Sequence, residues 1–172
     1  MLECQQLGDV PPLELRQRAR PSRAEEIGAA SGLVLEYDGT TTEQPSDSRE
    51  AFLPLLYGDR WAPVLVGWAS PDQVVPLEGD VAGLAYSRSA RDGRTGSVHS
   101  VTGQVVLDLD LRRFDTPTYV GVLRHELAHL VGLGHVEDES QIMHESAAVT
   151  SLQAGDLTGL AAVGAGPCAP QL

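Results

Sequence analysis

The stretch His125-Glu-Leu-Ala-His-Leu-Val-Gly-Leu-Gly-His135 carries three histidines in the pattern H-E-x-x-H-x-x-G-x-x-H. Residues four apart lie on one face of a helix, so His125 and His129 present two imidazoles to one point. Gly132 favours a helix end there, because glycine adopts positive φ without a steric penalty. The chain beyond Gly132 can then return His135 to the same point. Three protein ligands with a fourth position open are typical of a catalytic zinc site.

Glu126 lies one residue further round the same predicted helix. It is too close to His125 in sequence to act as another ligand, but it is well placed to hold a water molecule bound to the metal. We therefore expect Glu126 to be the general base. The alternative is an amphipathic helix whose histidines are merely solvated. That interpretation leaves Gly132 and His135 unexplained.

The histidine pattern followed by Met143 resembles the zinc-binding motif of the metzincin zinc peptidases. The eight residues from His135 to Met143 are similar to the short spacing of the matrixins, the matrix metalloproteinase-like family. Residues 103–108 resemble the last sheet strand before the matrixin zinc helix, and residues 152–160 resemble the start of the matrixin C-terminal helix. One departure stands out: many metzincins carry Tyr just after the Met, whereas His144 stands there in this chain.

The resemblance implies a mixed α/β (α+β) fold, with one metzincin catalytic domain over residues 1–172. The expected architecture is a twisted, mostly parallel five-stranded sheet with about three helices and a zinc cleft. The zinc helix and the Met-turn would occupy residues 116–148, and a C-terminal helix would occupy residues 151–164. Met143 would not bind the metal; its thioether would form an apolar floor beneath the imidazoles.

The resemblance also implies a place for substrate, on an exposed sheet edge above the zinc where main-chain hydrogen bonds can hold an extended peptide. The four residues assigned to this edge are Gly83, Leu84, Ala85 and Tyr86. The alternative is an ordinary solvent-facing edge strand. Side-chain selectivity would come from a pocket between the zinc helix near Leu123 and the chain over residues 144–148. We expect that pocket to accept an apolar or medium-sized side chain.

Local patterns predict several elements outside the motif. Ser22 and Glu25 form a capping box that predicts a short helix ending near Ser31. Alternating or β-branched apolar residues predict strands over residues 33–37, 64–68 and 105–109. Thr116 is expected to be the N-cap of the zinc helix, with Pro117 at its first helical position. Ser151 is expected to cap the C-terminal helix.

A second metal is a weaker expectation. Asp108, Asp110 and Asp115 lie close enough in sequence to share Ca²⁺. No glycine-turned loop of recognisable spacing accompanies them, so a solvated acidic turn is the alternative interpretation. His99 lies in a polar stretch and is expected either to be solvated or to belong to a second metal site.

Bulk properties limit the partners. The chain has 172 residues, a mass of 18.3 kDa and a formal net charge of −12. An acidic chain without a basic stripe repels nucleic acid and anionic membranes, and no apolar run is long enough for membrane insertion. The first residues show no signal-peptide pattern, so the protein is either cytoplasmic or a leader has been removed. We expect a secreted or extracellular protein.

The two cysteines, Cys4 and Cys168, support that expectation, because a bridge between them would close most of the chain. The alternatives are two free buried thiols, or a Cys4 thiolate that binds the zinc as matrixin propeptides do. An inhibitor or propeptide outside this chain is a further expected partner.

The expected function is that of a zinc-dependent endopeptidase with a peptide or protein substrate. Zn²⁺ held by His125, His129 and His135 would activate water, and Glu126 would carry the proton. Two alternatives remain open at this point. One is a non-catalytic binding domain that keeps zinc for stability, and the other is a zinc amidase that acts on cell-wall peptides.

Overall fold

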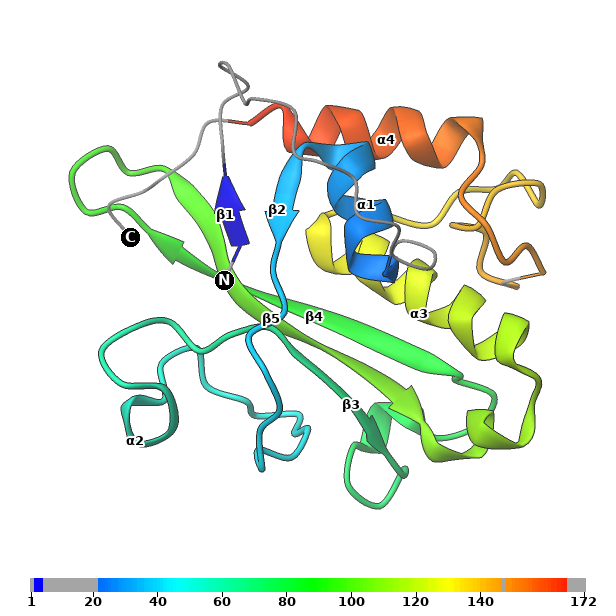
Figure 1. Ribbon diagram of the computed structural model, residues 1–172, viewed down its shortest axis with the longest axis horizontal. Helices are drawn as coiled ribbons and strands as arrows, with labels where there is room; N and C mark the ends of the chain where they lie inside the picture. Colours follow the sequence, from blue (N-terminus) through cyan, green and yellow to red (C-terminus); the bar gives the residue numbers. More distant parts are fainter. Residues whose placement is uncertain (1, 5–21, 147, 167–172) are drawn as a thin grey trace, which may run out of the picture.

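The computed structural model describes residues 2–4, 22–146 and 148–166, which form a mixed α/β fold (Figure 1). The mixed α/β class expected from the sequence is therefore confirmed. Four α-helices are described: α1 (Arg23–Ser31), α2 (Pro54–Tyr57), α3 (Thr116–Val131) and α4 (Ala154–Gly164). The described strands are β1 (Leu2–Cys4), β2 (Leu33–Leu35), β3 (Leu65–Ala69), β4 (Gly83–Arg91) and β5 (Val98–Asp108).

The main sheet has the strand order β3-β5-β4. Strand β3 pairs with β5 in parallel, with Leu65 opposite Gln104, and β4 pairs with β5 antiparallel, with Ala85 opposite Val105. Strands β1 and β2 form a separate antiparallel pair. A mostly parallel five-stranded sheet was expected. Within the described residues the structure instead has one three-stranded sheet and a separate two-stranded sheet.

A tight turn and a long connection explain this difference. Asp92 donates its N–H to the Ser97 carbonyl at 2.8 Å, which closes β4 directly onto β5, and strands joined so tightly must be antiparallel. Strand β2 stops at Leu35, and the following segment runs to residue 64 before β3 begins. This segment covers β3: Pro45 lies where a side chain at Gly67 would be, with Pro45 Cγ at 2.9 Å from an ideal Cβ.

Helices α1, α3 and α4 cover one face of the main sheet (Figure 1). The core between them joins side chains that are far apart in sequence, among them Ile27, Val105, Leu107, Val122, Leu127, Leu130, Ile142, Met143 and Leu160. A smaller cluster lies on the opposite face, under the 3-10 helix η1 (Val75–Leu77). None of the helices in the described part of the chain is both long and apolar enough to cross a membrane.

The helix ends agree with the sequence at some places and correct it at others. The Ser22–Glu25 capping box and the end of α1 at Ser31 are confirmed. The N-cap of α3 is Asp115 rather than Thr116, because the Asp115 carboxylate accepts the Thr118 N–H at 3.1 Å. Helix α4 begins at Ala154 rather than near residue 151, because the Asp156 carboxylate accepts the Gln153 N–H at 2.7 Å.

The remaining structural expectations have mixed outcomes. Strands are found at all three predicted places, although the last one begins earlier, at Val98. Cys168 of the expected Cys4–Cys168 disulfide lies outside the described part of the chain. Ala147, within residues 144–148 of the predicted selectivity pocket, also lies outside it.

Candidate metal centre

The three predicted histidines meet at one point. His125 and His129 come from α3, and His135 comes from the loop after it. The Nε2 atom of His135 lies 3.2 Å from His125 Nε2 and 3.0 Å from His129 Nε2. Nitrogen ligands of a tetrahedral zinc ion are about 3.3 Å apart, given Zn–N bonds of about 2.0–2.1 Å. In the described part of the chain, this is the one group of three or more metal-ligating side chains close enough to hold an ion.

Backbone carbonyls orient two of the imidazoles. His125 Nδ1 donates to the Ile142 carbonyl at 2.6 Å, and His129 Nδ1 donates to the Leu133 carbonyl at 2.7 Å. Since a carbonyl only accepts, each Nδ1 carries the proton and each Nε2 keeps its lone pair for the shared point. Burial also lowers the pKa of both rings, which favours the neutral imidazole that metal binding requires. This donor set fits a divalent cation that accepts nitrogen ligands.

Gly132 ends α3 as the spacing predicts. Its φ is +118°, in the region that favours glycine, and its N–H donates to the His129 carbonyl at 3.0 Å. The next residue, Leu133, donates its N–H to Ala128, so the chain turns back over the last turn of the helix. The turn therefore brings the Leu133 carbonyl to His129 and carries His135 to the centre.

Met143 is 1% exposed and packs in the main core, just after the carbonyl that holds His125. Its own carbonyl accepts the Val136 N–H at 3.1 Å, which ties the Met-turn to the loop that carries His135. Met143 is thus a buried core residue, and its role as a floor beneath the imidazoles stays a prediction.

Asp156 of α4, which no sequence pattern had indicated, holds the same turn. Its carboxylate is 3% exposed and accepts the N–H groups of Ile142 at 3.0 Å and Met143 at 3.3 Å. The backbone of Ile142 thus joins Asp156, through its N–H, to His125, through its carbonyl. An acidic residue in the first turn of a helix was the available sequence signal, but it indicates only a helix start.

Glu126 is 6% exposed, and its Cγ would lie 3.1 Å from a Cβ placed on Gly83 of β4. It forms no ion pair with the described residues. Burial raises the pKa of Glu126 to about 7. A carboxyl group with this pKa both accepts and returns a proton near neutral pH. Because Gly83 has no side chain, the Glu126 side chain can pack closely against β4.

The four residues of the predicted substrate edge lie in β4. Gly83 contacts the Glu126 region, and Ala85 packs on the face that α3 covers, whereas Leu84 belongs to the cluster on the opposite face. Tyr86 is half-buried, and burial together with the Asp47 charge raises its pKa. Within the described residues β4 pairs with β5 alone, so its other edge carries unpaired backbone groups.

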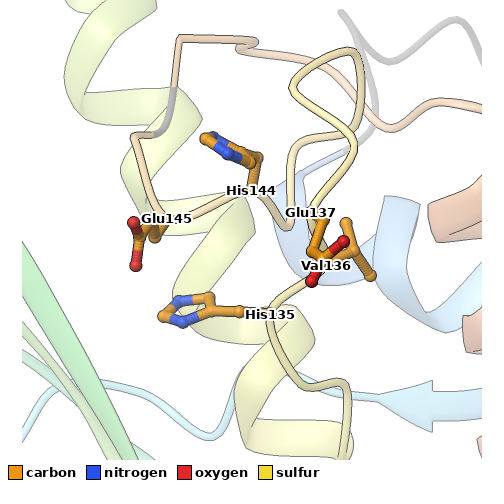
Figure 2. A pocket seen from close by; sticks show the side chains of 5 residues that line it. All are labelled: His135, Val136, Glu137, His144 and Glu145. Carbon is orange, nitrogen blue, oxygen red and sulfur yellow. The ribbon is translucent and has the colours of Figure 1, made fainter.

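A pocket of about 300 Å³ adjoins His135 (Figure 2). It is lined by His135, Val136, Glu137, His144 and Glu145. His144, which stands where many metzincins have Tyr, lies 2.7 Å through its Nδ1 from Ser146 Oγ. The pocket therefore presents two imidazoles and two carboxylates beside the single apolar side chain of Val136.

The aspartates considered for calcium have local partners. Asp108 accepts the Asp110 N–H at 2.6 Å, Asp110 pairs with Arg113 at 3.1 Å, and Asp115 caps α3. These contacts agree with the solvated acidic turn that the sequence left open. His99 lies in β5 and is not brought together with other metal-ligating side chains of the described residues.

The chain has no match among protein-family models, among curated proteins or among solved structures. Functional assignment therefore depends on the chemistry of the centre itself.

Proposed function

We propose that this protein is a zinc-dependent endopeptidase of metzincin type, closest to the matrixins. The convergence of the His125, His129 and His135 Nε2 atoms beside a buried Glu126 carries this proposal. A zinc site kept only for stability does not require a carboxyl group there. Burying Glu126, which raises its pKa, reduces the stability of the folded protein when Glu126 is ionised. A role in proton transfer would explain why such a group is present.

The chain's own residues divide the work. The three histidines would hold a zinc ion, which supplies Lewis acidity and a lower pKa for water at the centre. Glu126 accepts a proton from the attacking water and returns it to the amine that leaves when the peptide bond breaks. The Ile142 and Leu133 carbonyls keep the imidazoles in the tautomer that binds metal.

The free edge of β4 supports the choice of an extended peptide as substrate. A peptide that adds to Gly83–Tyr86 as a strand gains main-chain hydrogen bonds whatever its sequence. Gly83 sits against Glu126, so the edge passes directly beside the group that moves the proton. For a protein that cleaves extended chains we also retain the expectation of secretion and of control by an inhibitor or propeptide.

The test combines metal content with cleavage of a mixed peptide library, read by mass spectrometry. The purified protein is expected to hold one zinc per chain and to cleave peptides, to stop when treated with a chelator, and to recover when zinc is returned. His129→Ala should lose both zinc and cleavage. His99→Ala, a histidine distant from the centre in sequence, should keep both.

The alternatives give different results. A full zinc complement in His129→Ala would overturn the ligand assignment. Zinc binding without cleavage of any library member would favour the non-catalytic domain. Cleavage restricted to cell-wall peptides, with the linear library untouched, would favour the amidase.

A further inference from the structure

The hairpin formed by the distal halves of β4 and β5 is a basic surface of a strongly acidic protein. The chain carries a net charge of −12, yet residues 83–107 contain Arg88, Arg91 and Arg94 against a single acidic residue, Asp92. Asp92 is 4% exposed and accepts the backbone N–H groups of Arg94 and Thr95 inside the turn. The outward-facing charge of the hairpin is therefore positive.

These arginines differ from the others that the structure describes. Five arginines form ion pairs with carboxylates, and Arg112 lies over the Trp68 ring at 4.9 Å. Within the described residues Arg88 and Arg94 have no ion pair, and Arg91 donates to the Gly96 carbonyl at 2.5 Å. A carbonyl satisfies a donor without neutralising its charge, so Arg91 keeps its positive charge and the hairpin presents three guanidinium groups.

The basic hairpin continues the edge that begins at the metal centre. Strand β4 runs without a break from Gly83, beside Glu126, to Arg91. Helix α3 follows it only part of the way: Leu130 near the end of α3 lies against Gly103, which pairs with Ser87. Beyond that point the register shifts at Arg88/Ser89, and the hairpin projects past the helices (Figure 1).

We infer that the distal edge of β4 binds an acidic stretch of the substrate, N-terminal to the bond that is cleaved. This inference rests on the proposed peptidase function. Antiparallel pairing is slightly more stable per residue than parallel pairing, so an added peptide runs opposite to β4. Its N-terminal part then lies over the distal half of the strand. At about 3.4 Å per residue, Arg88 and Arg91 lie about 17 and about 27 Å from Gly83.

The substrate class follows from these lengths. Side chains about five to eight positions before the cleaved bond lie at Arg88 and Arg91, and Asp or Glu there would meet a guanidinium group. The rest of the acidic surface repels the same side chains. The hairpin should therefore favour substrates whose acidic residues lie before the cleaved bond over substrates whose acidic residues lie elsewhere.

Three peptides share one cleavable sequence taken from the library and test this inference. The first carries four Glu at five to eight positions before the cleaved bond, the second carries Gln at these positions, and the third carries the four Glu after the bond. The first should be cleaved with a kcat/KM about five- to tenfold above the second, mainly through KM. Added salt should reduce that ratio. The third should gain nothing.

Arg88→Gln combined with Arg91→Gln, which removes the two arginines that lie opposite the acidic stretch, should bring the ratio close to one and leave cleavage of the Gln peptide unchanged. Arg113→Gln, which removes an exposed arginine from another region, is the matched control and should keep the ratio. Fluorescence anisotropy with labelled Glu and Gln peptides measures binding independently of cleavage, and circular dichroism verifies that each variant is folded.

Equal binding of the Glu and Gln peptides by the parent protein would overturn the inference, whatever the cleavage data. A preference that survives the double substitution would also overturn it. An equal gain from Glu on either side of the bond would indicate a general anion surface instead. If no peptide is cleaved but Glu peptide binding depends on the hairpin, the proposed peptidase function fails and the basic edge remains as a binding surface.

Discussion

Two buried carboxyl groups, Glu126 and Glu43, have opposite surroundings. Glu126 lies beside the histidines with no cationic partner among the described residues, and burial raises its pKa to about 7. For Glu43 the largest influence is also burial, which raises the pKa. Hydrogen bonds from Arg49 and Tyr57 and the Arg49 charge outweigh burial, so the net pKa of Glu43 is lowered.

This comparison separates a group kept for chemistry from a group kept for structure. A carboxyl without a counter-ion exchanges protons near neutral pH and weakens the fold when ionised. A carboxylate held by a buried guanidinium stays ionised and joins segments together. Arg49 is 7% exposed and donates hydrogen bonds to both carboxylate oxygens of Glu43, at 2.7 and 3.1 Å. It also donates to the Pro63 and Gly103 carbonyls, both at 2.8 Å.

The largest expected effect is on Glu126. Glu126→Gln should retain zinc while kcat falls about 100- to 10,000-fold, because the metal ligands remain and the proton carrier is lost. Its free energy of unfolding at pH 7 should be unchanged or higher, since an unpaired buried acid has been removed. Zinc analysis, peptide cleavage and denaturant unfolding check these outcomes. Glu139→Gln, an exposed change, is the control; near-parent activity in Glu126→Gln would remove this residue from the mechanism.

Arg49→Met should have the largest effect on stability. It leaves Glu43 buried without its cation and removes the donor shared by the Pro63 and Gly103 carbonyls. We expect a loss of about 3–5 kcal/mol in unfolding free energy. Arg60→Met breaks a half-exposed pair with Asp38 and should cost less than about 1 kcal/mol. Similar losses in the two variants would contradict the role given to Arg49.

The sequence predicted arrangements of residues that are close together in the chain, and it missed contacts between distant segments. His125, Glu126, His129 and Gly132 lie within one helix and its end, where fixed spacing determines which side chains share a face. The carbonyl and hydroxyl partners of Arg49 come from β5 and from Pro63, two residues before β3, and no local pattern relates these segments. The number and direction of the strands in the main sheet also depend on contacts between distant segments, and the expected five-stranded, mostly parallel sheet is not found among the described residues.

Asp156→Asn should have an intermediate effect that reaches both stability and metal affinity. The amide that replaces the carboxylate cannot accept all three N–H groups, from Ile142, Met143 and Gln153. We expect a loss of about 1–3 kcal/mol in unfolding free energy. Zinc affinity should fall about 10- to 100-fold, because Ile142 orients His125. Competition with a chelating dye measures the affinity.

Asp110→Asn, on an exposed aspartate outside the centre, is the control for that affinity. An unchanged zinc affinity in Asp156→Asn would limit Asp156 to a structural role in α4.

The smallest expected effect is the pH dependence contributed by Glu43. Its pKa is lowered on folding, so its contribution to stability is present above the unfolded pKa of about 4.5 and is lost as pH falls through the lower folded value. Glu126 acts in the opposite direction, because its raised pKa relieves the fold as pH falls. The difference between the parent and Glu43→Gln isolates the first effect, since both proteins share Glu126 and the histidines. Thermal unfolding from pH 7 to pH 3 should show the parent more stable at pH 7, with the gap narrowing below about pH 4.5. A gap that stays constant with pH would mean that Glu43 contributes through packing and neutral hydrogen bonds, and the contrast between the two carboxyl groups would then rest on Glu126 alone.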